Sequence, residues 1–197
     1  MIFEISLTIL ILVLGLQIIR HFGGLFGYRS IFVKSIFISS VVLVFLLLFY
    51  TTWQQFEVWS QNEFSKFLLP PYQALDYFIF YSFFKFFAPY LISLFVALVF
   101  LFTAKFLNKK YQERFFYSEE LYFGALAIFL VGHPGWLFYI VFLIVIYLLI
   151  HLYSLFIIYD LSRRISLYYW WMPVGIFVIL ISNYWLSSLP LWQLLKV

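Results

Sequence analysis

Long apolar blocks separated by short polar segments run along the whole of this 197-residue chain. A bilayer core about 30 Å thick takes roughly 20 helical residues to cross, and several blocks approach or exceed that length. The candidate spans are Ile2–Ile19, Ile31–Trp53, Phe86–Ala104, Trp136–Tyr159 and Trp170–Leu186. Their apolar residues cover all sides, whereas the strands of a membrane barrel alternate in polarity over about ten residues. The pattern therefore predicts an all-α, polytopic transmembrane helical bundle.

Two further segments leave the number of spans at six or seven. Phe67–Phe84 is apolar enough to cross, but it carries two prolines, a glutamine and Asp76. Leu121–Val131 has only 11 residues, about 16 Å of helix, which is too short to cross alone. It spans only if the helix extends back through Phe115–Glu120, and otherwise it is a partly inserted helix. We predict a single integral membrane domain over residues 1–197.

The composition excludes a water-soluble domain, because 66% of the residues are hydrophobic and only 10% are charged. The chain has no cysteine, which excludes disulfides, thiolate metal sites and cysteine nucleophiles. Its three histidines are not at metal-ligand spacing, and Gly23–Gly27 lacks the strand-then-helix context of a nucleotide-binding loop. We therefore expect no metal, no cofactor and no nucleic-acid partner.

The first block is predicted to be a retained first helix rather than a signal peptide, because Glu4 rather than a basic residue precedes it.

The positive charges predict an orientation in the membrane. Most Lys and Arg residues fall in three clusters: Arg20, Arg29 and Lys34; Lys105, Lys109, Lys110 and Arg114; Arg163 and Arg164. With six spans all three lie on one face, which is then cytoplasmic, whereas a seventh span moves the first cluster outside. Charge therefore favours six spans, and we expect a bacterial inner membrane protein.

Ionisable residues near or inside apolar blocks are functional candidates, because burying a charge in lipid is costly. The candidates are Glu4, Glu63, Asp76, Lys85, Glu119, Glu120 and His151. Each also has a structural interpretation. We expect Asp76 to be a polar partner for a neighbouring helix and His151 to be hydrogen-bonded between helices. Glu119 and Glu120 begin a short apolar helix, where carboxylates cap free N–H groups. His133 is predicted to be a loop residue, and Lys85 to lie near a helix break at Pro89.

The last two-thirds of the chain contains several motifs in a fixed order. A basic loop at Lys105–Lys110 precedes Glu119–Glu120, and the apolar stretch that follows closes at Gly132, twelve residues after Glu120. This pattern resembles that of type IV prepilin peptidases, a family with a basic loop, a Gly-Asp pair and an apolar stretch ending in Gly at this spacing. A long span, a basic pair and a proline-centred final helix then follow in the family's order: Trp136–Tyr159, Arg163-Arg164 and Met172–Gly175. Upstream, Glu63 and Pro70 repeat the spacing of the family's first catalytic Asp and its proline. The resemblance covers residues 59–186.

The resemblance implies an intramembrane aspartic endopeptidase acting on pilin-like precursors. Glu63 and Glu120 would then be the acid and base around one water, with Glu119 beside them. Both Asp positions hold Glu here, the preceding Gly is Glu119, and the cysteine-rich loop of many members is absent. These departures predict altered or lost catalysis. A shared site also requires Phe67–Phe84 to cross, because six spans would place Glu63 and Glu120 on opposite sides.

The alternative is a non-enzymatic membrane subunit or assembly factor of a larger membrane complex. The scarcity of polar groups in the blocks and the absence of a soluble domain favour it. A transporter is less favoured, because Asp76, His151 and Asn183 lie on dispersed blocks and no inverted repeat is visible. The expected partners are the lipid bilayer and either a pilin-like precursor or other membrane subunits.

Overall fold

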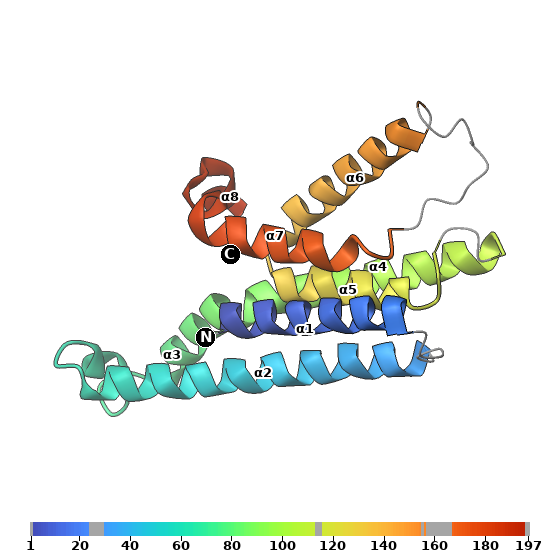
Figure 1. The fold of residues 1–197 in the computed structure, drawn as a ribbon. Coiled ribbons are helices and arrows are strands. Elements are labelled where there is room, and N and C mark those ends of the chain that lie inside the picture. Colours follow the sequence, from blue (N-terminus) through green and yellow to red (C-terminus); the bar gives the residue numbers. More distant parts are fainter. Residues whose placement is uncertain (1, 24–29, 113–115, 155, 157–166, 196–197) are drawn as a thin grey trace.

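The structure of this chain is a computed structural model. It describes residues 2–23, 30–112, 116–154, 156 and 167–195, and these form helices, turns and loops without strands. The all-α prediction is therefore confirmed. The helices are α1 (Ile2–Gly23), α2 (Ser30–Gln61), η1 (Ser65–Leu68), α3 (Leu75–Ser82), η2 (Phe83–Phe87), α4 (Ala88–Lys110), α5 (Glu120–Val131), α6 (Gly135–Tyr153), α7 (Trp171–Tyr184), η4 (Leu186–Ser188) and α8 (Pro190–Leu195) (Figure 1).

Some predicted features fall outside these ranges. They are most of the loop Gly23–Gly27, the basic residues Arg29, Arg114, Arg163 and Arg164, and the last residues of the predicted span Trp136–Tyr159.

Four helical stretches of the described chain are long and apolar enough to cross a membrane. They are Ile2–Ile19, Phe32–Gln61, Leu75–Lys110 and Gly135–Tyr153, and α5 and α7 are shorter apolar helices. Large apolar side chains also point outward, among them Leu46 (61% exposed), Phe95 (68%) and Phe102 (68%). Water would disfavour such a surface and hydrocarbon would not, so the arrangement is compatible with a membrane protein.

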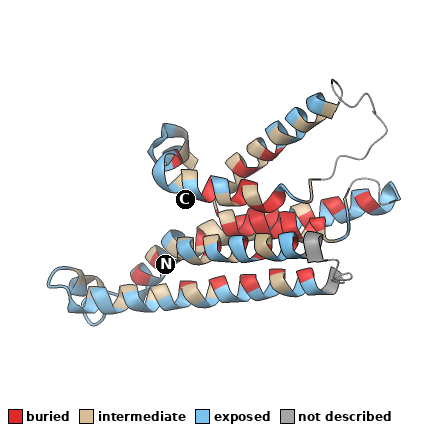
Figure 2. Cartoon of the chain, viewed as in Figure 1, coloured by how far each residue is buried: buried red, intermediate tan, exposed pale blue. Residues whose placement is uncertain are grey.

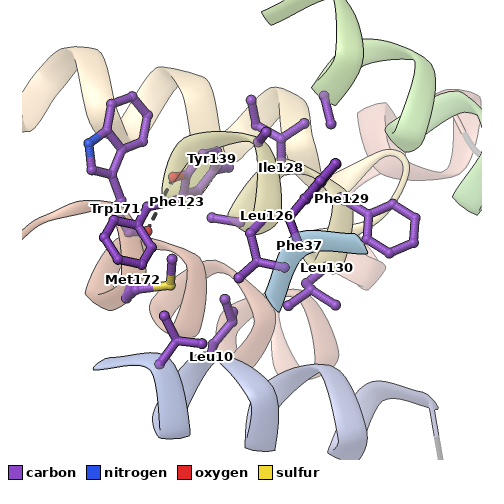
Figure 3. Packing of buried hydrophobic residues seen from close by; sticks show 14 of the residues in the cluster. Leu10, Phe37, Phe123, Leu126, Ile128, Phe129, Leu130, Tyr139, Trp171 and Met172 are labelled. Atoms are coloured by element: carbon purple, nitrogen blue, oxygen red, sulfur yellow. Dashed lines mark hydrogen bonds between the residues drawn. The ribbon is translucent and has the colours of Figure 1, made fainter. Parts of the chain in front are cut away.

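The short helix α5 forms the centre of the bundle. Ten of its 12 residues are buried, and it packs against α1, α2, α4, α6 and α7. Figure 2 shows the buried residues concentrated on α5 and on the faces turned toward it. Figure 3 shows its side chains, such as Leu126, meeting Leu10 of α1, Phe37 of α2 and Met172 of α7. The helix is apolar on every side because every side has a protein neighbour.

The predicted extension of this helix back through Phe115–Glu120 is wrong. The helix begins at Glu120, and residues 116–119 form a turn. The buried side chain of Asn108 donates to the carbonyl of Phe116 (2.7 Å) and accepts its N–H (3.0 Å). Because both backbone groups of Phe116 are bound to this side chain, they are not available to a helix. At 12 residues α5 is about 18 Å long.

Phe67–Phe84 does not form a separate helix in the structure. After η1 and a turn through Pro70 and Pro71, a helical stretch begins at Leu75 and continues without interruption to Lys110. The helix break predicted near Pro89 is instead a π-helical turn, η2, immediately before it. A proline lacks the N–H of the ordinary helical hydrogen bond, and a wider turn accommodates the ring. Residues 75–84 and 86–104 therefore run in the same direction.

Candidate functional site

Glu63 lies in the turn that follows α2. Its side chain is exposed, and its neighbour Asn62 accepts the backbone N–H groups of Phe64 (2.9 Å) and Ser65 (3.1 Å). The local hydrogen bonds therefore hold the turn in place without using the carboxylate.

Glu120 occupies a different environment at the first residue of α5. It is only 1% exposed, and its Oε2 accepts the backbone N–H of Tyr117 (3.2 Å). A carboxylate here also interacts favourably with the positive end of the helix dipole. Glu119 is half-buried immediately before the helix. The Glu120 bond therefore goes to the loop before the helix, and the N-cap residue Glu119 makes no side-chain cap hydrogen bond. The Glu120 carboxylate is held in a fixed position at one end of the bundle.

The structure does not bring Glu63 and Glu120 together. A small cavity is lined by Phe123 in the first turn of α5 and by Phe32 and Val33 in the first turn of α2, so the two helices start side by side. Figure 1 shows both starts at one end of the bundle and the end of α2 at the other. The 29 residues from Val33 to Gln61 correspond to about 40 Å of helix. Two carboxylates that share one catalytic water must lie within a few Å of each other.

Within the part of the chain that the structure describes, Asp76 and His151 make no interhelical hydrogen bond. Asp76 is exposed in the first turn of α3, so its expected role as a buried partner for another helix is wrong. The helix dipole favours a carboxylate at that position. His151 stacks on Tyr147 of its own helix, with ring centroids 6.2 Å apart.

Lys85 lies in the π-helical turn, where its ammonium donates to the hydroxyl of Tyr81 and lies over the rings of Tyr81 and Phe86. His133 connects the α5–α6 turn to the C-terminal helix. Its Nδ1 accepts the indole N–H of Trp136 (3.1 Å), and its Nε2 bonds to the carbonyl of Leu195 (2.6 Å).

A cluster of polar side chains between α4 and α5 was not predicted as a site. The ammonium of Lys105 donates to the hydroxyl of Tyr122 (3.0 Å) and lies 4.9 Å from the centre of its ring. These groups border a cleft of about 470 Å³ lined by Lys105, Asn108, Lys109, Gln112, Ser118, Leu121 and Tyr122. The sequence held a signal for it, because Lys105 and Lys109 are spaced by four residues and so share one face of a helix. The lysines were interpreted as orientation signals alone.

A second cleft, of about 240 Å³, lies between α6 and the helices α4, α5 and α7. Phe100, Ile128, Leu143 and Trp171 are among the side chains that line it, and no polar surface contributes. The described surface of this cleft is therefore apolar and presents no acid, base or nucleophile.

No group of three His, Asp or Glu side chains that could hold a metal occurs in the part of the chain that the structure describes. No protein family model, curated protein or solved structure matches the chain. Its function is therefore inferred from its own residues and their arrangement.

Proposed function

We propose that this chain is an integral membrane protein that crosses the bilayer six times and acts without catalysis, as an anchoring or assembly subunit of a larger membrane complex. Six crossings correspond to α1, α2, the stretch from α3 to α4, α5, α6 and α7, which alternate in direction (Figure 1). The connections between α1 and α2, α4 and α5, and α6 and α7 then share one side of the membrane. That side carries the three basic clusters and is cytoplasmic by the positive-inside rule.

The short central helix is consistent with this topology. Backbone without regular helical bonds is tolerated at membrane depth where protein surrounds it. The turn that ends α5 has this protection, because Gly132, Pro134 and Gly135 are all buried. Gly132 adopts a φ of 73°, which favours glycine and ends the helix before α6 begins. Because protein surrounds both this turn and the helix, the 12 residues of α5 can cross without contact with lipid.

The separation of Glu63 from Glu120 carries the non-catalytic half of the proposal. An aspartic peptidase pair needs two carboxylates around one water, and here about 40 Å of helix lies between them. Among the described residues Glu120 is the only charged side chain buried inside the bundle, which also argues against a transport pathway. What remains is a large apolar surface that suits lipid and other membrane helices.

Descent from type IV prepilin peptidases, with loss of catalysis, is compatible with this role in a bacterial inner membrane. Two observations support it. The spacing from Glu120 to Gly132 corresponds to one structural unit, the first residue of α5 and its C-terminal cap. Gly175, in the proline-containing helix α7, packs closely against Ala127 of α5. In that case a pilin-like precursor would be a binding partner rather than a substrate.

Sidedness tests the proposal directly. The chain has no cysteine, so single Glu63→Cys and Ser118→Cys variants each offer one thiol to a membrane-impermeant maleimide. In intact cells we expect labelling at position 63 and none at position 118, which should react only after the membrane is opened. Gln61→Cys and Gln112→Cys are exposed controls for the two ends.

If both positions are protected from the reagent in intact cells, the six-span topology is wrong, and Glu63 and Glu120 lie on the same side of the membrane. The assay to follow would then be cleavage of a co-expressed pilin precursor by the wild-type and Glu120→Gln proteins. Cleavage that Glu120→Gln abolishes would overturn the non-catalytic role.

A further inference from the structure

The cleft between the last turns of α4 and the first turn of α5, hereafter the basic cleft, presents hydrogen-bond donors. The oxygen of Tyr122 accepts a bond from Lys105, so its own O–H must point elsewhere. Within the described ranges no acceptor for that proton is found. Lys109 is exposed one turn further along α4, and Ser118 adds an exposed hydroxyl on the opposite wall.

The other polar groups described around the cleft do not neutralise the positive charge of Lys105 and Lys109. The amide of Asn108 is occupied by the backbone of Phe116. Glu119 and Glu120 follow Ser118 in the chain, but neither lines the cleft, and Glu120 is 1% exposed and bound to the N–H of Tyr117. Of the residues that the structure describes, none forms an ion pair with Lys105 or Lys109. A matching ligand is therefore an anion with several acceptor oxygens.

We propose that the basic cleft binds a phosphate ester group. Ammonium and hydroxyl donors together suit an oxyanion that accepts several charge-assisted hydrogen bonds. The cleft volume of about 470 Å³ admits a glycerol phosphate as well as the phosphate itself, and Leu121 supplies an apolar wall. The donors also lie where the apolar helix ends, since exposed Phe102 and Phe106 flank Lys105. An anionic phospholipid headgroup and a soluble phosphate ester both have this chemistry.

This site is independent of the anchoring role. The lysines would bind phosphate whether or not the chain belongs to a larger complex. Failure of one proposal would therefore leave the other standing.

Native mass spectrometry of the full chain in detergent tests the proposal, with phosphatidylglycerol and phosphatidylcholine titrated separately. We expect tighter binding of phosphatidylglycerol. A Lys105→Gln/Lys109→Gln protein should lose about 10- to 30-fold in that affinity, since each basic side chain near an anionic headgroup contributes a factor of about five. The matched control is Lys66→Gln/Lys85→Gln, which removes two exposed lysines near the other end of the bundle and should leave affinity unchanged.

Further arms identify the source of the phosphate and guard against misfolding. Competition by glycerol 1-phosphate would indicate a soluble ester, and its failure to compete would indicate a lipid headgroup. Tyr122→Phe removes one donor and keeps the ring, so it should fold normally and weaken phosphatidylglycerol binding a few-fold. Equal binding of the two lipids, with no binding of glycerol 1-phosphate, would overturn the proposal. So would equal losses in the cleft and control variants.

Discussion

Small residues set how closely the helices approach α5. A Cβ at Gly124 would lie 2.7 Å from Cε1 of Phe100 and 2.9 Å from Cζ3 of Trp171. Both rings are part of one aromatic cluster, with centroids 5.5 Å apart. Apolar solvent gives helices no hydrophobic reason to associate, so close packing of small residues is a main source of stability in membrane bundles. Gly124 is therefore a packing residue rather than a flexible one.

The substitution Gly124→Ala should destabilise the protein. An added methyl group forces two packed rings to move, and overpacking of this kind costs about 1–3 kcal/mol. The measurement is thermal unfolding in detergent, where we expect the midpoint to fall by several degrees. Gly15→Ala is the matched control, because no atom lies within 4 Å of its added Cβ and alanine favours helix. A midpoint that falls equally in both proteins would show that crowding at Gly124 is not the cause.

Buried hydrogen bonds join the helices at a few points. The hydroxyl of Tyr139 in α6 donates to the carbonyl of Trp171 in α7 (3.2 Å, dashed in Figure 3). Ser93 of α4 donates to the carbonyl of Phe129 in α5 (3.3 Å). Each occupies a carbonyl near a helix contact, and unpaired polar groups are costly in an apolar core. The side chains thus orient α6 and α4 on the central helix.

At the scale of elements, the loop between α4 and α5 decides where α5 begins. Asn108 binds both backbone groups of Phe116, and Glu120 then starts the helix with Tyr117 as its partner. The start position matters because it places Tyr122 one turn in, opposite Lys105. A helix that began earlier would rotate and displace the residues of the basic cleft.

We expect Asn108→Ala to lower stability by about 1–3 kcal/mol, because it leaves the N–H and carbonyl of Phe116 without their partner in a half-buried position. Asn62→Ala is the control. It also removes two bonds to backbone, but in an exposed turn where water replaces them. Unfolding by denaturant or heat in detergent compares the two. A loss no larger for Asn108→Ala than for Asn62→Ala would contradict the proposed clamp.

At the scale of the whole molecule, the two ends of the bundle differ in character. One end carries Lys105, Lys109 and the basic cleft. The other, where α2 ends and α3 begins, carries a cluster of aromatic rings in which Trp59 contacts Tyr77 and Tyr81, with centroids 6.3 and 4.7 Å away. Aromatic rings of this kind are enriched at both membrane interfaces, so this cluster is compatible with an interface at this end of the bundle.

The length of the bundle is itself measurable. Spin labels on a Glu63→Cys/Ser118→Cys protein should give a distance distribution centred near 40 Å, because α2 continues without interruption between the two ends. Gln61→Cys/Glu63→Cys serves as the short-distance control. A principal distance below about 20 Å would show that the chain folds back and brings the two carboxylates near each other.

The sequence by itself determined that this protein is helical and where most helices lie. Long apolar blocks leave the backbone no partner but itself, so α1, α7 and the starts of α2 and α6 were located closely from hydropathy alone. The end of α2 was not, because that helix continues through a more polar segment to Gln61. It also located the short helix at Leu121–Val131, because its apolar run ends at Gly132. These are local properties of the sequence, so they do not depend on which neighbours each helix packs against.

Tertiary structure decided which polar residues meet. The family resemblance paired Glu63 with Glu120, but one continuous helix over Leu75–Lys110 and another over α2 hold them about 40 Å apart. It likewise brought Lys105 to Tyr122 across a loop whose shape depends on Asn108. Apolar helices fit one another in many registers, so hydropathy alone does not specify how they pack. The specific contacts of Gly124, Asn108 and Tyr139 do, because each loses close packing or a buried hydrogen bond in any other arrangement.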